Sequence, residues 1–284
     1  MNQLKTIAVI GAGTMGQGIA QVFAAGGFKT LLYDANSTMP ASAKANIAKG
    51  LDGLVQKGKL TTDGKEKTLN NIQPIQHQQE LVADLLIEAI VEDLAIKQTL
   101  FRALEEINST ETIFCTNTSS LSVSKTFEHG THQHRCMGVH FFNPAQVMKL
   151  VELISGNQTS PELLKQVAAL LQSLGKTTVV SKDSPGFIVN RVARHYYLES
   201  LKNLEMGSAT VGEIDALLRA TGFKMGAFEL MDLIGVDVNL AVSAAVYNGF
   251  NQNPKYKPNE FQVNIVKEGR LGRKSGRGFY NYEK

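Results

Sequence analysis

The sequence predicts an α/β fold in which a doubly wound, mostly parallel sheet is followed by an all-helical C-terminal domain. A glycine turn at 11–16 follows the apolar run 7–10 and opens an apolar-periodic helix. Short apolar runs then alternate with helical patterns until about residue 182, which is typical of a parallel sheet. Beyond the Ser-Pro-Gly turn at 184–186 only helical spacing remains. We therefore expect two domains, 1–186 and 187–284.

The elements follow in order along the chain, each predicted from apolar periodicity and its end signals. The expected strands are 7–10, 29–33, 85–89, 112–115, 137–142, 151–154 and 177–180. In the first domain the expected helices are one after the glycine turn, 40–58, one capped near Thr61, 95–107 and 161–174. In the second domain they are 188–206, 211–221, 228–248 and 259–268, of which 228–246 is apolar all round.

The turn Gly11-Ala12-Gly13-Thr14-Met15-Gly16 predicts a dinucleotide site of the Rossmann type. Its three glycines allow a sharp turn, close backbone approach to a pyrophosphate, and tight packing of helix against strand. Free N–H groups at the helix start would hold the phosphates. Asp34 ends the second strand, where a carboxylate accepts ribose hydroxyls and repels a 2′-phosphate. We therefore expect NAD rather than NADP.

Composition favours a soluble globular protein over several other classes. The chain has 284 residues, and 29 basic against 26 acidic side chains leave a net charge of +3, which argues against nucleic acid or a membrane as the main partner. No apolar run has the length of a membrane span and no secretory segment is evident, so we expect a cytoplasmic protein, or a matrix-targeted one only if a presequence has been removed. The histidines at 129, 132 and 134 lie in a polar loop without a zinc-ligand spacing, and we expect no metal.

Two buried-looking titratable residues predict an acid–base pair. His140 lies among aromatic residues at a strand end, and Glu152 interrupts the apolar run 150–154. An unpaired carboxylate there would be costly, so each residue is a candidate partner for the other, although His140 alone also suits a satisfied core position. Such a dyad would fix the imidazole tautomer and stabilise the imidazolium while a proton leaves an alcohol during hydride transfer to NAD.

Two further polar positions lie where ligands collect in such folds. The uncharged stretch 116–120 follows a strand, where it suits hydrogen bonding to a nicotinamide or a substrate oxygen, although a plain turn explains it as well. Asn190 starts the first helix of the second domain, and it can donate to a carbonyl or alkoxide oxygen or simply cap the helix.

Motifs in these regions resemble those of the 3-hydroxyacyl-CoA dehydrogenases, particularly the short bacterial 3-hydroxybutyryl-CoA dehydrogenases. The matching segments run in the family's order over nearly the whole chain. They are Gly11 to Gly16, Asn117-Thr118-Ser119-Ser120-Leu121, His140-Phe141-Phe142-Asn143-Pro144, Met148-Lys149-Leu150-Val151-Glu152, Asp183-Ser184-Pro185-Gly186-Phe187 with Asn190-Arg191, and Gly276-Arg277-Gly278-Phe279-Tyr280.

The resemblance implies an NAD-dependent oxidation of an L-3-hydroxyacyl-CoA and its reverse, in fatty-acid or related acyl-CoA metabolism. It implies that His140 is the base, that Glu152 orients it, and that Ser119 and Asn190 hold the substrate oxygen. It also implies a homodimer formed through the helical domain, and contact of Lys57 with a CoA phosphate. The cofactor site would include Glu92, Lys97, Asn117, Ser119, Asn143 and Lys274. Departures at 195–196 and 224–229 leave the preferred acyl chain open.

Two other functions remain in competition. A free β-hydroxy-acid dehydrogenase has the same two-domain plan, but it is expected to use a lysine as its central catalytic group. A crystallin-like NAD-binding protein would not need the dyad, whereas this chain keeps both His140 and Glu152.

Overall fold

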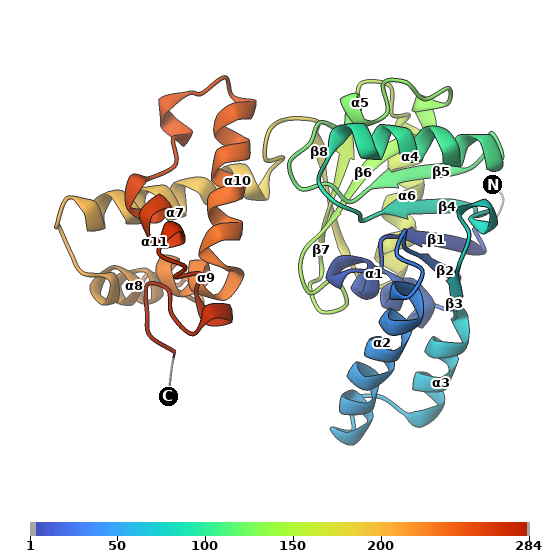
Figure 1. Cartoon of the computed structure of the whole chain (residues 1–284), viewed down its shortest axis with the longest axis horizontal. Coiled ribbons are helices and arrows are strands. Elements are labelled where there is room, and N and C mark those ends of the chain that lie inside the picture. Colours follow the sequence, from blue (N-terminus) through green and yellow to red (C-terminus); the bar gives the residue numbers. More distant parts are fainter. Residues whose placement is uncertain (1–3, 283–284) are drawn as a thin grey trace. The chain divides into compact units, whose positions relative to one another are not determined.

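A computed structural model describes residues 4–282 of the chain and divides it into two compact units, 1–183 and 184–284. In Figure 1 the first unit runs from blue to yellow and the second continues to red. The first unit ends three residues (186 − 183) before the predicted domain end. All the strands of the named sheet lie in the first unit, and the second unit consists mainly of helices.

The first unit is built on an eight-stranded sheet with the order β3-β2-β1-β4-β5-β6-β7-β8. Neighbouring strands are parallel except for β6 and β7, which pair antiparallel. This topology confirms the predicted doubly wound, mostly parallel sheet. The strands are β1 Thr6–Ile10, β2 Lys29–Tyr33, β3 Ile72–Ile75, β4 Leu85–Glu88, β5 Ile113–Thr116, β6 Cys136–Phe141, β7 Leu150–Ser155 and β8 Thr177–Lys182.

Strand β3 is the one strand of this sheet that the sequence analysis missed. It has only four residues, it contains Pro74, and it lies at the sheet edge beyond β2. Because proline has no N–H to donate, it is tolerated on an edge strand and hides the strand signal.

Several helices of the first unit begin where a short polar side chain caps them. Thr61 accepts a hydrogen bond from the Gly64 N–H, as its predicted capping position requires, and Asp93 and Ser160 cap α4 and α6 in the same way. The helices are α1 Thr14–Ala25, α2 Met39–Gln56, α3 Thr62–Asn71, α4 Leu94–Ile107, α5 Val123–Thr126 and α6 Pro161–Ser173.

The second unit packs its helices around Leu201, Phe228 and Met231, which are fully buried. The predicted single helix 228–248 is wrong, because Gly235 has a φ of 106° and the chain bends there by 100° between α9 and α10. Glycine adopts this left-handed backbone without steric cost, so it ends one helix and starts the next. The helices are α7 Val189–Glu205, α8 Val211–Ala220, α9 Ala227–Ile234, α10 Val236–Gly249 and α11 Glu260–Lys267.

Among the described residues, no single helix is long and apolar enough to cross a membrane. The bent pair α9 and α10 meets that criterion only when the two are joined, on length and composition alone.

Candidate active site

The glycine turn after β1 has the backbone geometry that a dinucleotide site requires. Gly11 has a φ of 102°, and a Cβ on it would lie 2.4 Å from the Ala89 carbonyl oxygen. A Cβ on Gly16 would lie 1.7 Å from the Gly11 carbonyl oxygen, whereas a Cβ on Gly13 would meet nothing within 4 Å. Gly11 and Gly16 are therefore needed for close packing, and Gly13 keeps the space before α1 open. No side chain caps α1 at Gly13, which suits an anion at this helix start.

Asp34 lies at the end of β2 and is anchored beside the glycine turn. Its Oδ2 accepts a hydrogen bond from the Ala12 N–H at 2.8 Å, and its Oδ1 accepts one from the Asn36 N–H at 2.9 Å. Each carboxylate oxygen has a second lone pair, so the group can also accept the hydroxyls of a ribose. The glycine turn, the uncapped helix start and this carboxylate together fit an NAD molecule.

We expect Asp34→Ala to relax the choice of cofactor, because it removes the charge that repels a 2′-phosphate. The ratio of kcat/KM with NADH to that with NADPH should fall by about tenfold or more. Steady-state kinetics with both cofactors measures this ratio. Asp63→Ala, which removes an exposed carboxylate on α3, should leave the ratio unchanged. A wild-type protein that prefers NADPH would contradict this assignment.

His140 and Glu152 are opposite each other on the antiparallel strands β6 and β7. Their side chains meet, with His140 Nδ1 2.8 Å from Glu152 Oε2. Glu152 is fully buried and His140 is 6% exposed. A carboxylate only accepts, so we assign the proton to Nδ1, which places the lone pair of the neutral ring on Nε2. The pair has the geometry of an oriented general base.

A buried ion pair joins the end of β4 to helix α4. Glu88 and Lys97 are 0% and 1% exposed, and Lys97 Nζ lies 2.5 Å from Glu88 Oε1. The hydroxyl of Thr116 donates to Glu88 Oε2 at 2.7 Å, and the Ile90 N–H donates to Oε1 at 2.7 Å. Glu88 was not predicted as a site residue from the sequence, although it interrupts an apolar run as Glu152 does.

Glu92 shapes the loop that follows β5. Its Oε1 accepts hydrogen bonds from the Thr118 hydroxyl at 2.6 Å and from the Ser119 and Ser120 N–H groups at 2.9 and 3.1 Å. Burial alone would raise the pKa of Glu92, but Lys97, 3.2 Å away, and these hydrogen bonds hold the pKa below its usual value. Glu92 is thus a charged acceptor that fixes the backbone of Ser119.

Asn117 links this loop to the strand that carries the histidine. Its Oδ1 accepts a hydrogen bond from the Phe141 N–H at 2.9 Å, one residue beyond His140. The ends of β4, β5 and β6 are therefore tied together by Glu88, Glu92 and Asn117. These contacts show how the fold holds the predicted cofactor residues, and their contact with NAD stays a prediction.

The remaining predicted residues are in other places. Asn143 follows β6, and exposed Lys57 ends α2. In the second unit, Asn190 is in the first turn of α7, and Lys274 Nζ donates to Asp237 Oδ2 at 2.7 Å. Their proposed ligand contacts stay predictions.

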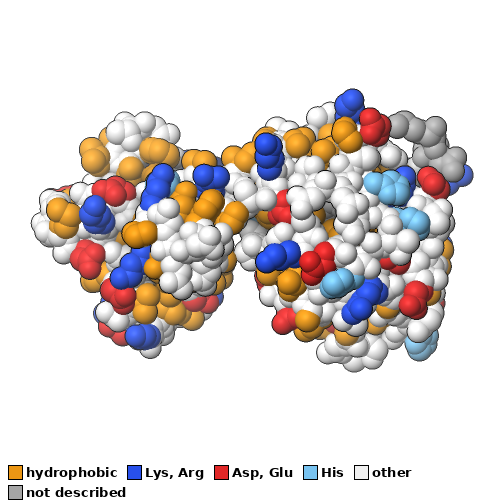
Figure 2. Space-filling model, turned by 90° about the horizontal axis from the view of Figure 1, so that it is seen from above, with side chains coloured by type: hydrophobic (Ala, Val, Ile, Leu, Met, Phe, Trp, Pro, Cys, Tyr) orange, Lys and Arg blue, Asp and Glu red, His pale blue; other side chains and the backbone are white. Residues whose placement is uncertain are grey.

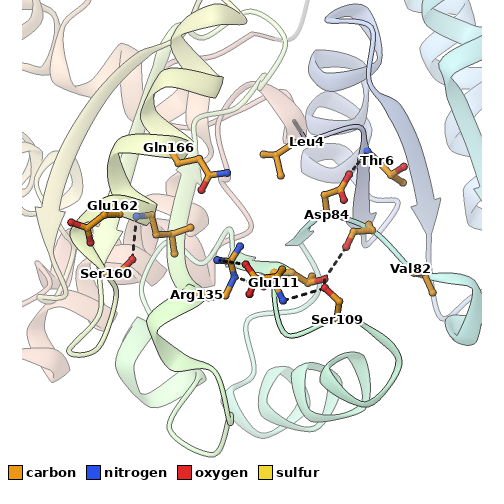
Figure 3. Close-up of a pocket in the computed structure, with 13 residues that line it drawn as sticks. Leu4, Thr6, Val82, Asp84, Ser109, Glu111, Arg135, Ser160, Glu162 and Gln166 are labelled. Atoms are coloured by element: carbon orange, nitrogen blue, oxygen red, sulfur yellow. Dashed lines mark hydrogen bonds and ion pairs between the residues drawn. The ribbon is translucent and has the colours of Figure 1, made fainter. Parts of the chain in front are cut away.

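A cavity of about 630 Å³ lies at the end of the sheet where several parallel strands begin (Figure 3). Thr6 starts β1, Asp84 directly precedes β4, and Arg135 directly precedes β6. Ligands of parallel sheets bind at the carboxyl ends of the strands. We therefore place the active site at those ends and not in this cavity.

The fold and these residues define an oxidoreductase with a dinucleotide-binding domain, and family models identify it further. The model for the 3-hydroxyacyl-CoA dehydrogenase NAD binding domain matches residues 6–184, and that for the family's C-terminal domain matches 186–282. The chain therefore belongs to the 3-hydroxyacyl-CoA dehydrogenase family. This membership confirms the predicted resemblance, the enzyme class and the NAD cofactor.

Similar proteins cover the whole chain. It is 45% identical to 3-hydroxyadipyl-CoA dehydrogenase of Escherichia coli, over 99% of this chain but only 60% of that relative's length. It is 38% identical to mitochondrial hydroxyacyl-coenzyme A dehydrogenase of Sus scrofa, over 99% of this chain and 92% of that one. Among solved structures, (S)-3-hydroxybutyryl-CoA dehydrogenase of Ralstonia eutropha matches with a TM-score of 0.95 and 38% identity, over 99% and 100% of the two chains.

Proposed function

We propose that the chain is an NAD-dependent L-3-hydroxyacyl-CoA dehydrogenase of the 3-hydroxybutyryl-CoA type that acts reversibly in acyl-CoA metabolism. The observation that carries this proposal is the buried pair of His140 and Glu152, with 2.8 Å between Nδ1 and Oε2. NAD, when bound, accepts a hydride from C3 of the substrate. The chain must then remove the proton of the 3-hydroxyl group, and a base oriented by a carboxylate is suited to that task.

Each residue has one task in this proposal. His140 takes the hydroxyl proton at Nε2 and becomes an imidazolium, which the buried Glu152 carboxylate stabilises. Ser119 and Asn190 hold the 3-oxygen as its charge changes. In the reverse direction the imidazolium returns its proton to the oxygen.

The competing free β-hydroxy-acid dehydrogenase would need an available lysine. Lys97 is held by ion pairs to Glu88 and Glu92 and is 1% exposed, so it is poorly placed to transfer protons. Lys57 is exposed at the end of α2, which suits the CoA phosphate that we propose it contacts.

The purified chain should oxidise NADH when acetoacetyl-CoA is added, with kcat in the ordinary range of about 1 to 1000 per second. Absorbance of NADH measures this turnover. Binding of NADH without turnover would contradict the proposal and favour a crystallin-like binding protein. Turnover of free 3-oxo acids at comparable kcat/KM would favour the competing dehydrogenase.

We also propose that the chain forms a homodimer through the second unit. We propose separately that it is a cytoplasmic protein. Val192, Leu233, Ile234 and Val238 of this unit are large apolar side chains that are 44% to 67% exposed in the single chain. Figure 2 shows hydrophobic side chains gathered on the face of the second unit that it presents. Exposed large apolar side chains favour association.

The acyl chain is where the names of the relatives differ. An adipyl group, in the name of the Escherichia coli relative, ends in a carboxylate, whereas a butyryl group, in the name of the Ralstonia eutropha protein, ends in a methyl group.

A further inference from the structure

A buried arginine in the second unit lacks the carboxylate partner that such a residue usually has. Arg194 of α7 is 3% exposed, and none of the ion pairs within residues 4–282 includes it. Burial lowers the pKa of Arg194 to about 10, with Tyr197 acting in the opposite direction. The guanidinium therefore stays charged at neutral pH, and a buried charge without a counter-charge is unfavourable.

Neutral groups nevertheless hold the guanidinium in one place. Its Nε donates to the Asn190 carbonyl at 3.1 Å, and its Nη1 donates to the Asn239 carbonyl at 2.9 Å and to the Ser243 hydroxyl at 2.7 Å. The hydrogen bonds found among the described residues use Nε and Nη1 and do not use Nη2. Arg194 is thus fixed in position and charged, with donor capacity left on Nη2.

A second donor beside it also lacks an acceptor. Asn239 is 2% exposed, and its Oδ1 accepts hydrogen bonds from Gln262 Nε2 at 3.0 Å and from Arg194 Nη1 at 3.4 Å. Because arginine only donates, its contact sets the orientation of the amide. Within the described part of the chain, Asn239 Nδ2 is buried without a hydrogen-bond partner. A carboxylate has only acceptors, so it would satisfy this donor and the guanidinium together.

We propose that Arg194 and Asn239 bind a carboxylate at the far end of the acyl chain, so that the preferred substrate is the 3-hydroxyacyl-CoA of a dicarboxylic acid. This inference rests on the proposed function, in which Asn190 holds the 3-oxygen. Arg194 follows Asn190 by four residues, hence on the same face of α7 and about one turn, or about 5.4 Å, further along. In an extended six-carbon chain, the terminal carboxyl carbon lies about 4 Å beyond C3, a comparable span.

Two substrates of equal length test the proposal, 3-hydroxyadipyl-CoA and 3-hydroxyhexanoyl-CoA. The wild-type chain should prefer the first by about tenfold or more in kcat/KM. Arg194→Met should lower kcat/KM for the adipyl substrate by about 10- to 100-fold, the range for losing a charged hydrogen bond, mainly through KM. The value for the hexanoyl substrate should stay within about twofold, because its methyl end makes no such bond.

Two further variants keep the test decisive. Lys202→Met removes an exposed positive charge from the same helix and should change neither value. Asn239→Asp places an internal carboxylate beside Arg194, so it should abolish the preference without leaving a buried charge unpaired, even if Arg194→Met fails to fold. A wild-type chain without the preference, or equal losses with both substrates, would overturn the inference while the dehydrogenase proposal stands. Failure to turn over either substrate would contradict the dehydrogenase proposal as well.

Discussion

Replacing His140 with glutamine should lower kcat by at least about 100-fold, the usual scale for losing a general base. Glutamine keeps a polar side chain beside Glu152 but cannot take the hydroxyl proton. NAD affinity should stay nearly unchanged, because the glycine turn and Asp34 are in other elements. Initial rates with acetoacetyl-CoA and NADH, together with NADH titration by fluorescence, measure the two effects separately.

The matched control is His134→Gln, which alters an exposed histidine just before β6. It should leave kcat within about twofold of the wild-type value. If His140→Gln keeps most of its kcat, the proposed base is wrong, whatever the effect on cofactor binding.

Lys97→Met should produce the largest loss of stability that we predict for a single substitution. Glu88 would then be a fully buried carboxylate without its cation, and breaking such a pair costs about 3 to 5 kcal/mol. Urea unfolding followed by circular dichroism should show this decrease in the free energy of unfolding of the first unit.

Lys67→Met provides the comparison, because Lys67 and Asp63 form an exposed pair on α3. Its effect should not exceed about 1 kcal/mol. The double variant Lys97→Met with Glu88→Gln should recover part of the lost stability, since the buried charge is gone. Equal effects of Lys97→Met and Lys67→Met would show that the buried pair has no special role.

Most strands of the sheet were predictable because each of these carries its own apolar pattern in the sequence. β1 and β2 are apolar runs next to a glycine turn and an acidic residue, so both the strands and their ligand-binding end were evident. β3 was not, because Pro74 and its four-residue length weaken the pattern. The break at Gly235 was missed because the apolar residues on both sides of it continue at helical spacing.

The site residues, too, were predictable from the sequence only in part. His140 and Glu152 were paired because each needs a partner in apolar surroundings, but the register that joins them depends on β6 and β7 being antiparallel. The eight residues 142–149 between the strands are too few for a crossover helix, a signal that the sequence analysis did not use. Arg194 could not be singled out, because Asn239 and Ser243, which hold its guanidinium, lie 45 and 49 residues away in the sequence.

The antiparallel pairing of β6 and β7 also limits how this enzyme can vary. Side chains alternate between the two faces of a strand, so a shift of one residue would turn Glu152 to the face opposite His140. A single-residue insertion or deletion inside β7 would therefore separate the two groups while both remained in the sequence. The length of this strand up to Glu152 therefore matters to the pairing as much as the identities of the two side chains do.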